Sequence, residues 1–175
     1  MQTDRIFAGS IPALYDRYLG PLIFEPYAAE LAGRVASGTA SRILETAAGT
    51  GILTRVLARL LPDTTEIVAT DLNQPMLDFA AAQPGTARVT WRRADALALP
   101  FPDQSFDVVA CQFGAMFFPD KIAAYREALR VVGRGGYLIF SVWDIGRSFP
   151  QRPGPWRVSP SLQGRGLSVK NRRPA

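Results

Sequence analysis

Between residues 42 and 144 the chain alternates short apolar runs with segments of helical periodicity, and no other feature limits its fold as strongly. The apolar runs predict strands, namely 42–47, 66–71, 89–95, 105–113 and 137–144. The segments between them predict helices, namely 52–61, 74–83 and 119–132, with the glycine-rich turn GRGG before the last strand. Strands that alternate with helices predict an α/β fold with a Rossmann-like, doubly wound sheet of mainly parallel strands.

The two flanks of this region differ from it. Residues 11–37 are predicted to be mainly helical, with a break near Gly20 and Pro21. Residues 145–175 hold five of the 14 prolines and lack helical or strand periodicity, so this segment is expected to be irregular. The chain is therefore predicted to have one domain over residues 1–144, with a helical N-terminal lid, and a basic tail over residues 145–175.

The net charge of +5 belongs to that tail, which carries seven basic residues and no acidic ones. Residues 1–144 keep 13 basic and 15 acidic residues, a balance of −2, so the sequence does not support a basic nucleic-acid groove across the domain. The tail itself is either a solvated extension or a contact for nucleic acid or acidic lipid.

Missing residue types exclude several kinds of site. The chain has no histidine, which rules out a Ser-His-Asp triad and any zinc site that needs histidine, and no metal is expected. No apolar run approaches the roughly 20 residues that span a bilayer. The one cysteine, Cys111, fits a core position and a reducing compartment, so a cytoplasmic location is expected.

The stretch ETAAGTG, residues 45–51, lies between the first predicted strand and the helix that follows. In such sheets, ligands bind beyond the carboxyl ends of the strands, and glycines such as Gly49 and Gly51 let the backbone approach a ligand closely. Asp71 ends the next strand, where an acid can accept hydrogen bonds from ribose hydroxyls. The alternatives are a tight structural turn for the loop and a helix cap or Asx turn for Asp71.

The residues around the loop narrow the choice of cofactor. A phosphate-binding P-loop is excluded because Ile52, rather than lysine, follows Gly51. A dinucleotide fingerprint is disfavoured because Thr54 stands where the third glycine belongs. The run instead fits an acid-x-G-x-G-x-G loop that begins at Glu45, with Ala47 at the first glycine position. Alanine disfavours positive φ, so affinity would fall if this position requires it.

Four stretches resemble class I S-adenosylmethionine-dependent methyltransferases in order: ILETAAGTG, IVATDLNQPML, RRADALALPFPDQSFDVVACQFGAMFFPD and ALRVVGRGGYLIFSVWD. The resemblance covers roughly residues 10–144 and is nearest to the small-molecule group that includes the ubiquinone and menaquinone C-methyltransferases. It implies S-adenosylmethionine as the cofactor and a small organic molecule as the methyl acceptor. The acceptor's identity, a general base, catalytic residues and a homo-oligomeric state are not fixed by the sequence.

The resemblance also implies cofactor-binding roles. Tyr15 belongs to the lid with Tyr18, Glu45 opens the loop, and Gln112 sits near the methionine moiety with Phe113. The others are the loop backbone at Ala47, Gly49 and Gly51, Asp71 for the ribose, Leu72 and Met76 for the adenine ring, and Asp95 with the Ala96 backbone for its amino edge. Simpler alternatives stay open, namely Glu45 as a brace of the loop, Asp95 as a turn residue, Met76 as a core residue and the tyrosines as packing residues.

The resemblance stops at SVWD, whereas a full sheet of this class has seven strands. The sequence therefore predicts that strands 6 and 7 are missing and that the C-terminus is truncated or frame-shifted. The leading function is S-adenosylmethionine-dependent methyl transfer. Its alternatives are a non-catalytic S-adenosylmethionine-binding domain without a complete acceptor pocket and, less favoured, a nicotinamide-dependent oxidoreductase.

Overall fold

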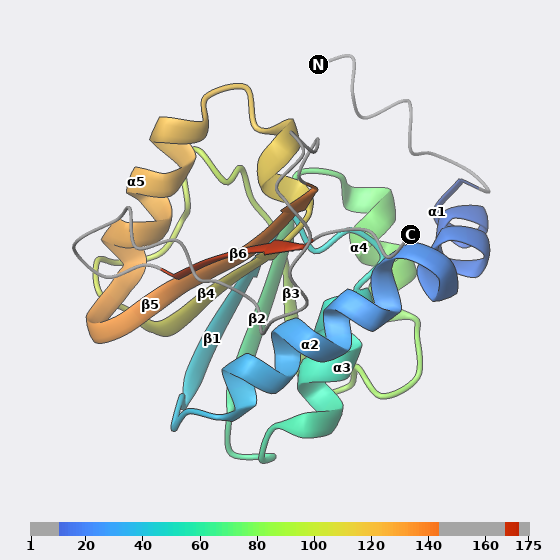
Figure 1. Cartoon of the computed structure of the whole chain (residues 1–175), viewed down its shortest axis with the longest axis horizontal. Coiled ribbons are helices and arrows are strands. Elements are labelled where there is room, and N and C mark those ends of the chain that lie inside the picture. The colour runs from blue at the N-terminus through green and yellow to red at the C-terminus, as the bar shows by residue number, and fades with distance from the viewer. Residues whose placement is uncertain (1–10, 144–166, 172–175) are drawn as a thin grey trace, which may run out of the picture.

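The computed structural model describes residues 11–143 and 167–171, which form one six-stranded sheet with helices on both faces (Figure 1). The strands are β1 (Arg42–Thr46), β2 (Glu66–Asp71), β3 (Val89–Arg93), β4 (Phe106–Gln112), β5 (Val132–Trp143) and β6 (Leu167–Asn171). Their order is β3-β2-β1-β4-β5-β6, and every neighbouring pair is parallel. The predicted doubly wound parallel sheet is confirmed.

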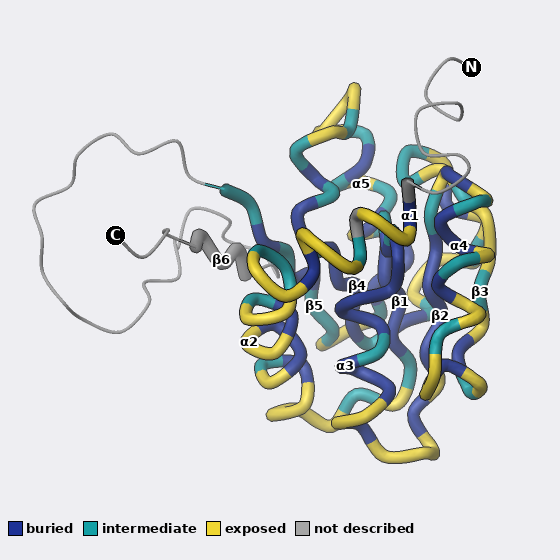
Figure 2. Tube along the Cα trace, turned by 90° about the vertical axis from the view of Figure 1, so that its right-hand side faces the viewer, coloured by how far each residue is buried: buried dark blue, intermediate teal, exposed yellow. Residues whose placement is uncertain are grey.

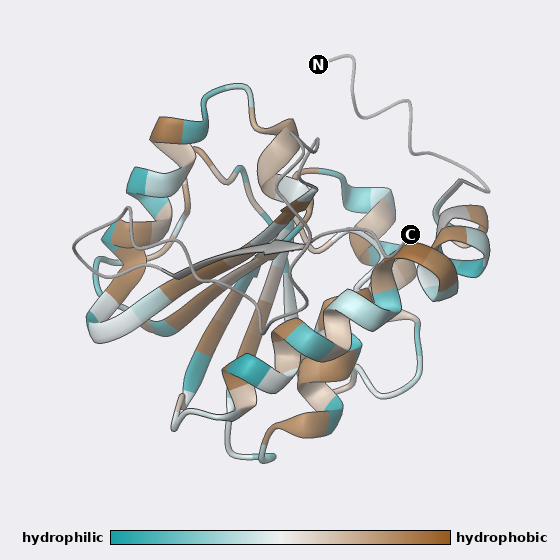
Figure 3. Cartoon of the chain, in the orientation of Figure 1, coloured by the Kyte–Doolittle hydropathy of each residue, from teal (hydrophilic) through white to brown (hydrophobic). Residues whose placement is uncertain are grey.

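Two apolar clusters join the helices to the sheet. On one face, α2 (Glu25–Ala36) and α3 (Ile52–Leu60) pack against residues such as Ile43 and Ile139. On the other face, α5 (Lys121–Val131) packs against residues such as Leu44 and Val109. The remaining helix, α4 (Gln74–Ala81), packs on β2 and β3. Figures 2 and 3 show the consequence, a buried and largely apolar central sheet with polar, exposed residues on the outer faces of the helices.

The N-terminal helical region runs on without the predicted break at Gly20 and Pro21. It consists of α1 (Ile11–Leu14), the π-helix η2 (Tyr15–Phe24) and α2. At the junction the amide of Glu25 donates to the carbonyl of Gly20, five residues earlier. Pro21 has no amide hydrogen to donate, and the wider π turn accommodates it without ending the helix.

The GRGG segment is also not a separate turn, because β5 begins at Val132 and includes it. The strand register shifts there: Phe106 pairs with Val132, whereas Val108 pairs with Tyr137. A Cβ atom at Gly136 would overlap the Asp107 carbonyl oxygen, so the strands approach closely at a residue without a side chain. The glycines that predicted a turn instead form an irregularity within a long strand.

The prediction of an irregular tail is wrong for residues 167–171, which form β6 and pair with β5 from Ile139 to Trp143. An edge strand presents unpaired amides and carbonyls, and this short segment satisfies those of β5. Its five residues stand between glycine- and arginine-rich stretches, so periodicity could not reveal it. Only one strand follows β5 among the described residues, and the rest of the predicted tail lies outside them.

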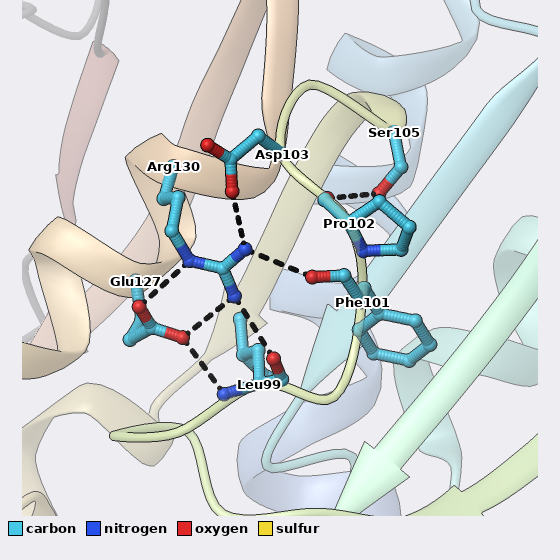
Figure 4. A network of polar contacts seen from close by, with 7 residues as sticks. All are labelled: Leu99, Phe101, Pro102, Asp103, Ser105, Glu127 and Arg130. Atoms are coloured by element: carbon cyan, nitrogen blue, oxygen red, sulfur yellow. Dashed lines mark hydrogen bonds and ion pairs between the residues drawn. The ribbon is translucent and has the colours of Figure 1, made fainter.

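A half-buried guanidinium network holds the connection between β3 and β4 on α5 (Figure 4). Arg130 donates to the carbonyls of Leu99 and Phe101 at 2.9 and 2.8 Å and forms ion pairs with Asp103 and Glu127 at 2.7 and 2.8 Å. The second oxygen of Glu127 accepts the amide of Leu99 at 2.9 Å. The hydrogen bond from Arg130 lowers the pKa of Glu127. One helix residue therefore fixes the path of the loop that follows Asp95.

Replacement of Arg130 by methionine is expected to lower the free energy of unfolding by about 2 kcal/mol, because two loop carbonyls and two carboxylates lose a charged donor. Arg126→Met, at an exposed position of the same helix, is the matched control and should change stability by less than about 0.5 kcal/mol. Urea unfolding followed by fluorescence measures both. Equal losses in the two variants would contradict a role for the network in holding the loop.

No helix within residues 11–143 and 167–171 is both long and apolar enough to cross a membrane.

Candidate functional site

The sheet topology brings the loops after β1 and β4 together. The strand β1 lies between β2 and β4, so the chain leaves β1 toward one side of the sheet and later crosses to the other. Ligands bind at such a switch point, beyond the carboxyl ends of the strands. The loop 47–51 follows β1, and the 3-10 helix η3 (Gly114–Phe117) follows β4. These segments touch, since a Cβ atom at Gly114 would overlap the Ala47 methyl group.

The loop carries several residues in the left-handed region, with φ of 53° at Ala47, 56° at Gly49 and 77° at Gly51. For Ala47 this conformation costs about 1 kcal/mol relative to glycine, so the substitution in the loop pattern is not neutral. A Cβ atom at Gly49 would meet nothing within 4 Å, whereas one at Gly51 would lie 2.8 Å from the Trp91 ring. The backbone at Gly49 therefore has open space beside it for a ligand, whereas the backbone at Gly51 is covered by the Trp91 ring.

Hydrogen bonds fix this loop from within the protein. The amides of Ala48, Gly49 and Gly51 donate to the Thr70 carbonyl, Asp71 Oδ2 and the Ala48 carbonyl at 2.9, 2.8 and 2.9 Å. The next helix, α3, has no side-chain cap at its N-terminus. Its first amides are thus the backbone donors that remain for an anionic group, as expected at a helix start.

Glu45 is the last but one residue of β1 and is fully buried, with 1% of its surface exposed. Its Oε2 accepts the Thr54 hydroxyl at 2.6 Å. Burial raises its pKa from 4.5 to about 8, the Thr54 hydrogen bond opposes this, and the negative charge of Asp71 adds to it. Glu45 therefore braces α3 against β1 through a side chain, and at neutral pH it is mainly protonated.

Both predicted adenosine-binding acids close Asx turns. Asp71 Oδ1 accepts the amide of Asn73 at 2.8 Å while Oδ2 accepts Gly49. Asp95 is exposed, and its Oδ1 accepts the amide of Leu97 at 2.9 Å. The turn interpretation thus holds for both residues. A carboxylate has about four acceptor sites, so the bond to Leu97 leaves acceptor capacity on Asp95 for an adenine donor.

Gln112 ends β4 and ties the sheet to the N-terminal helices, because its Nε2 donates to the Phe24 carbonyl at 2.8 Å. Phe113 follows with φ of 58° and is buried. Its ring stacks on Trp143 with centroids 4.3 Å apart and meets Tyr27 edge-on at 5.5 Å. We call Phe24, Tyr27, Phe113 and Trp143 the aromatic cluster. The cluster joins η2 and α2 to the carboxyl ends of β4 and β5.

The other predicted residues occupy different environments. Leu72 is 48% exposed, whereas Met76 is 6% exposed and therefore a core residue in the protein alone. Ala96 lies beside the Asp95 turn and is half-buried. Tyr18 is 57% exposed, and the side chain of Tyr15, at the start of η2, lies outside the described part of the chain. Cys111 is buried, and burial raises its pKa to about 11, as suits a core thiol.

The sequence did not identify two polar residues of α3 that hold the site. Thr54 donates to Glu45, and Arg55 contacts both the Thr50 carbonyl and Asp16. The available signal was Thr54 itself, a polar residue on the buried side of an apolar helix, which needs a partner. Trp91 was missed because its contact with the position of Gly51 depends on the pairing of β3 with β2.

The site fits an elongated polar cofactor better than a metal ion. The open space at Gly49, the uncapped start of α3 and the buried Thr50 hydroxyl, which has no partner, lie within one loop. Asp71 stands beside them and Asp95 follows the neighbouring strand. By contrast, within the described ranges no group of three or more His, Cys, Asp or Glu side chains could hold a metal.

Comparison with known proteins gives one family match. The model of a family described as "Methyltransferase domain" matches residues 44–140. The ubiquinone/menaquinone biosynthesis C-methyltransferase UbiE of Pseudomonas aeruginosa is 40% identical over 121 residues, which are 67% of this chain and 46% of that protein. The chain thus spans less than half the length of this relative.

Two solved structures extend the comparison. A putative S-adenosylmethionine-dependent methyltransferase of Methanococcus maripaludis has a TM-score of 0.66 and 22% identity, covering 75% of this chain and 63% of that one. At that identity the similarity concerns the fold alone. The [4+2]-cyclase SpnF has a TM-score of 0.59 and 28% identity, covering 66% of this chain and 43% of that one.

Proposed function

The chain belongs to the methyltransferase domain family, because the family model covers more than half of it, and from that premise we propose that it transfers a methyl group to a small organic acceptor. The family implies S-adenosylmethionine as the cofactor. The observation that carries the proposal is the loop at the switch point, open at Gly49 and fixed by Asp71.

Different residues of the site would bind different parts of the cofactor. Asp71, at the carboxyl end of β2, would accept the ribose hydroxyls, and the Asp95 turn would hold the amino edge of the adenine. The uncapped start of α3 would face the carboxylate of the methionine moiety. Leu72 is exposed after β2, where it would cover one face of the adenine ring.

The main task of the protein in this reaction would be to align the acceptor with the methyl group of the cofactor. The cofactor supplies a methyl group that its sulfonium charge already activates. The chain's own contribution is to hold the acceptor atom in line with that methyl group, which can be worth several kcal/mol, and to exclude water. The aromatic cluster, fixed by Gln112 at Phe24, forms an apolar wall suited to this second task.

For the acceptor we propose a hydroxylated aromatic ring, with a ring carbon as the methylated atom. The support is twofold: the relative from Pseudomonas aeruginosa carries the name of a quinone-biosynthesis C-methyltransferase, and the aromatic cluster includes Phe113, directly after β4, the strand beside β1. Planar rings stack favourably on such side chains.

Replacement of Gly49 by alanine is expected to weaken S-adenosylmethionine binding at least tenfold, because the new methyl group would occupy the open space where the cofactor approaches the backbone. The loss of stability should stay near 1 kcal/mol, the cost of the left-handed conformation. Gly85→Ala is the matched control, since Gly85 has φ of 80° and also open space around its Cβ position. Calorimetric titration measures the affinity; equal affinities for the two variants would place the cofactor elsewhere.

A methyl-transfer screen tests the function itself. The full chain is incubated with methyl-labelled S-adenosylmethionine and a panel of quinols, phenols and amines, and label in the product is counted. The proposal predicts transfer to a quinol or phenol. Tight cofactor binding without transfer to any member would favour a non-catalytic domain instead. SpnF, which is similar in fold, is named for a cyclisation, so this fold also supports functions other than methyl transfer.

A further inference from the structure

One guanidinium group joins the N-terminal helices to the glycine loop. Arg55, on α3, donates from Nη2 to Asp16 Oδ1 at 2.9 Å and from Nη1 to the Thr50 carbonyl at 2.8 Å. Asp16 belongs to η2 and Thr50 to the loop, so two segments far apart in the sequence share one cation. The pair is shielded, with 22% of the Arg55 side chain and 19% of the Asp16 side chain exposed.

The contact fixes one peptide plane of the loop. Arg55 holds the Thr50 carbonyl, and the Gly51 amide, at the other end of the same peptide unit, donates to the Ala48 carbonyl at 2.9 Å. A peptide unit is planar, so holding both ends sets its orientation. The residues before and after Thr50, Gly49 and Gly51, are glycines with positive φ. Glycines change their backbone angles at low energetic cost when such restraints are absent.

Apolar packing and polar contacts both hold the N-terminal helices against the rest of the protein. A groove of about 700 Å³ runs beside this packing and is lined in part by Pro21, Glu25, Ile52 and Arg55. At the other end of η2, Gln112 donates to the Phe24 carbonyl. Polar contacts therefore fasten η2 at both of its ends, and Arg55 is the one that also reaches the loop.

We propose that Arg55 is a positioning residue of the cofactor site, through which docking of η2 at Asp16 stabilises the loop conformation that binds the cofactor. The inference rests on the proposed function and deepens it, because it names the residue that links the helical lid to the loop. Coupling of this kind is reciprocal, so bound cofactor also stabilises the docked position of η2.

Cofactor dissociation tests the coupling, with S-adenosylhomocysteine as the probe. In Asp16→Asn, which leaves the contact of Arg55 with Thr50 in place, we expect the dissociation rate constant to rise roughly tenfold in stopped-flow fluorescence. Arg55→Met should give a larger rise, and adding Asp16→Asn to it should change nothing further. The control is Arg34→Met, which breaks the exposed Arg34–Glu30 pair of α2, 2.6 Å long, and should leave the rate unchanged.

Hydrogen exchange separates coupling from a merely structural role. In wild type, S-adenosylhomocysteine should slow amide exchange across η2, and in Asp16→Asn this protection should be lost while exchange in β1 and β4 stays slow. An unchanged dissociation rate in Asp16→Asn, with η2 still protected by the ligand, would overturn the inference alone. Failure of the wild-type chain to bind the ligand would instead overturn the proposed function on which the inference rests.

Discussion

The Gly51→Ala variant is expected to lose about 3 kcal/mol of unfolding free energy, the sum of a left-handed alanine and an overpacked contact. Gly51 has φ of 77°, and a Cβ atom there would lie 2.8 Å from Trp91 Cη2 and 3.0 Å from Ala80 Cβ. Trp91 packs against the apolar cluster beneath α3 and cannot swing away without disturbing it. The loop would have to move away from β3 and α4, and the switch point would lose its shape.

Gly85→Ala separates the two costs. Gly85 has φ of 80° but open space at its Cβ position, so its variant should lose only about 1 kcal/mol. Chemical denaturation of both variants, with wild type in parallel, gives the difference directly. If Gly51→Ala lost no more unfolding free energy than Gly85→Ala, Trp91 would not pack tightly enough on Gly51 to exclude a side chain there.

Glu45→Gln should stabilise the protein at pH 8 by several kcal/mol and have little effect at pH 5. The pKa of Glu45 rises from 4.5 when unfolded to about 8 when folded, chiefly through burial. A raised carboxyl pKa adds stability that is complete below pH 4.5 and is lost as the pH rises to about 8, because only the unfolded chain ionises in that window. Each pH unit within the window costs about 1.4 kcal/mol.

Glutamine keeps the contact that matters, since its carbonyl oxygen can still accept the Thr54 hydroxyl. Urea unfolding of wild type and variant at several pH values from 5 to 8 measures the effect. The wild-type free energy of unfolding should fall with pH more steeply than that of the variant. Parallel curves would mean that Glu45 is ionised in the folded protein. Positive charge near it, in addition to that of Arg55, would then have to offset the effect of burial on its pKa.

Local patterns were sufficient to predict the sheet and to locate the glycine loop after its first strand. Apolar runs and helical spacing located β1 to β5 and α3 to α5, because each element buries a continuous face. Alternation then predicted parallel strands, and the glycines with Asp71 pointed to the switch point. The errors at Pro21 and at residues 133–136 share a cause: proline and glycine predict a break, yet a π turn and a strand irregularity can absorb them.

What the sequence could not supply were contacts between distant segments. The partners Thr54 for Glu45 and Asp16 for Arg55 depend on how α3 docks on the sheet and how η2 docks on α3. The strand β6 depends on an edge that exists only once β5 has formed. The left-handed conformation of Ala47 is likewise set by the loop's tertiary hydrogen bonds, because alanine itself disfavours it.

The central claim is that the loop after β1 binds S-adenosylmethionine, and calorimetric titration of the wild-type chain tests it most directly. S-adenosylmethionine, S-adenosylhomocysteine and NAD are titrated separately into the same protein preparation. We expect the first two to bind at one molecule per chain and NAD to give no measurable heat. Preferential binding of NAD, or no binding of either sulfur-containing ligand, would contradict it.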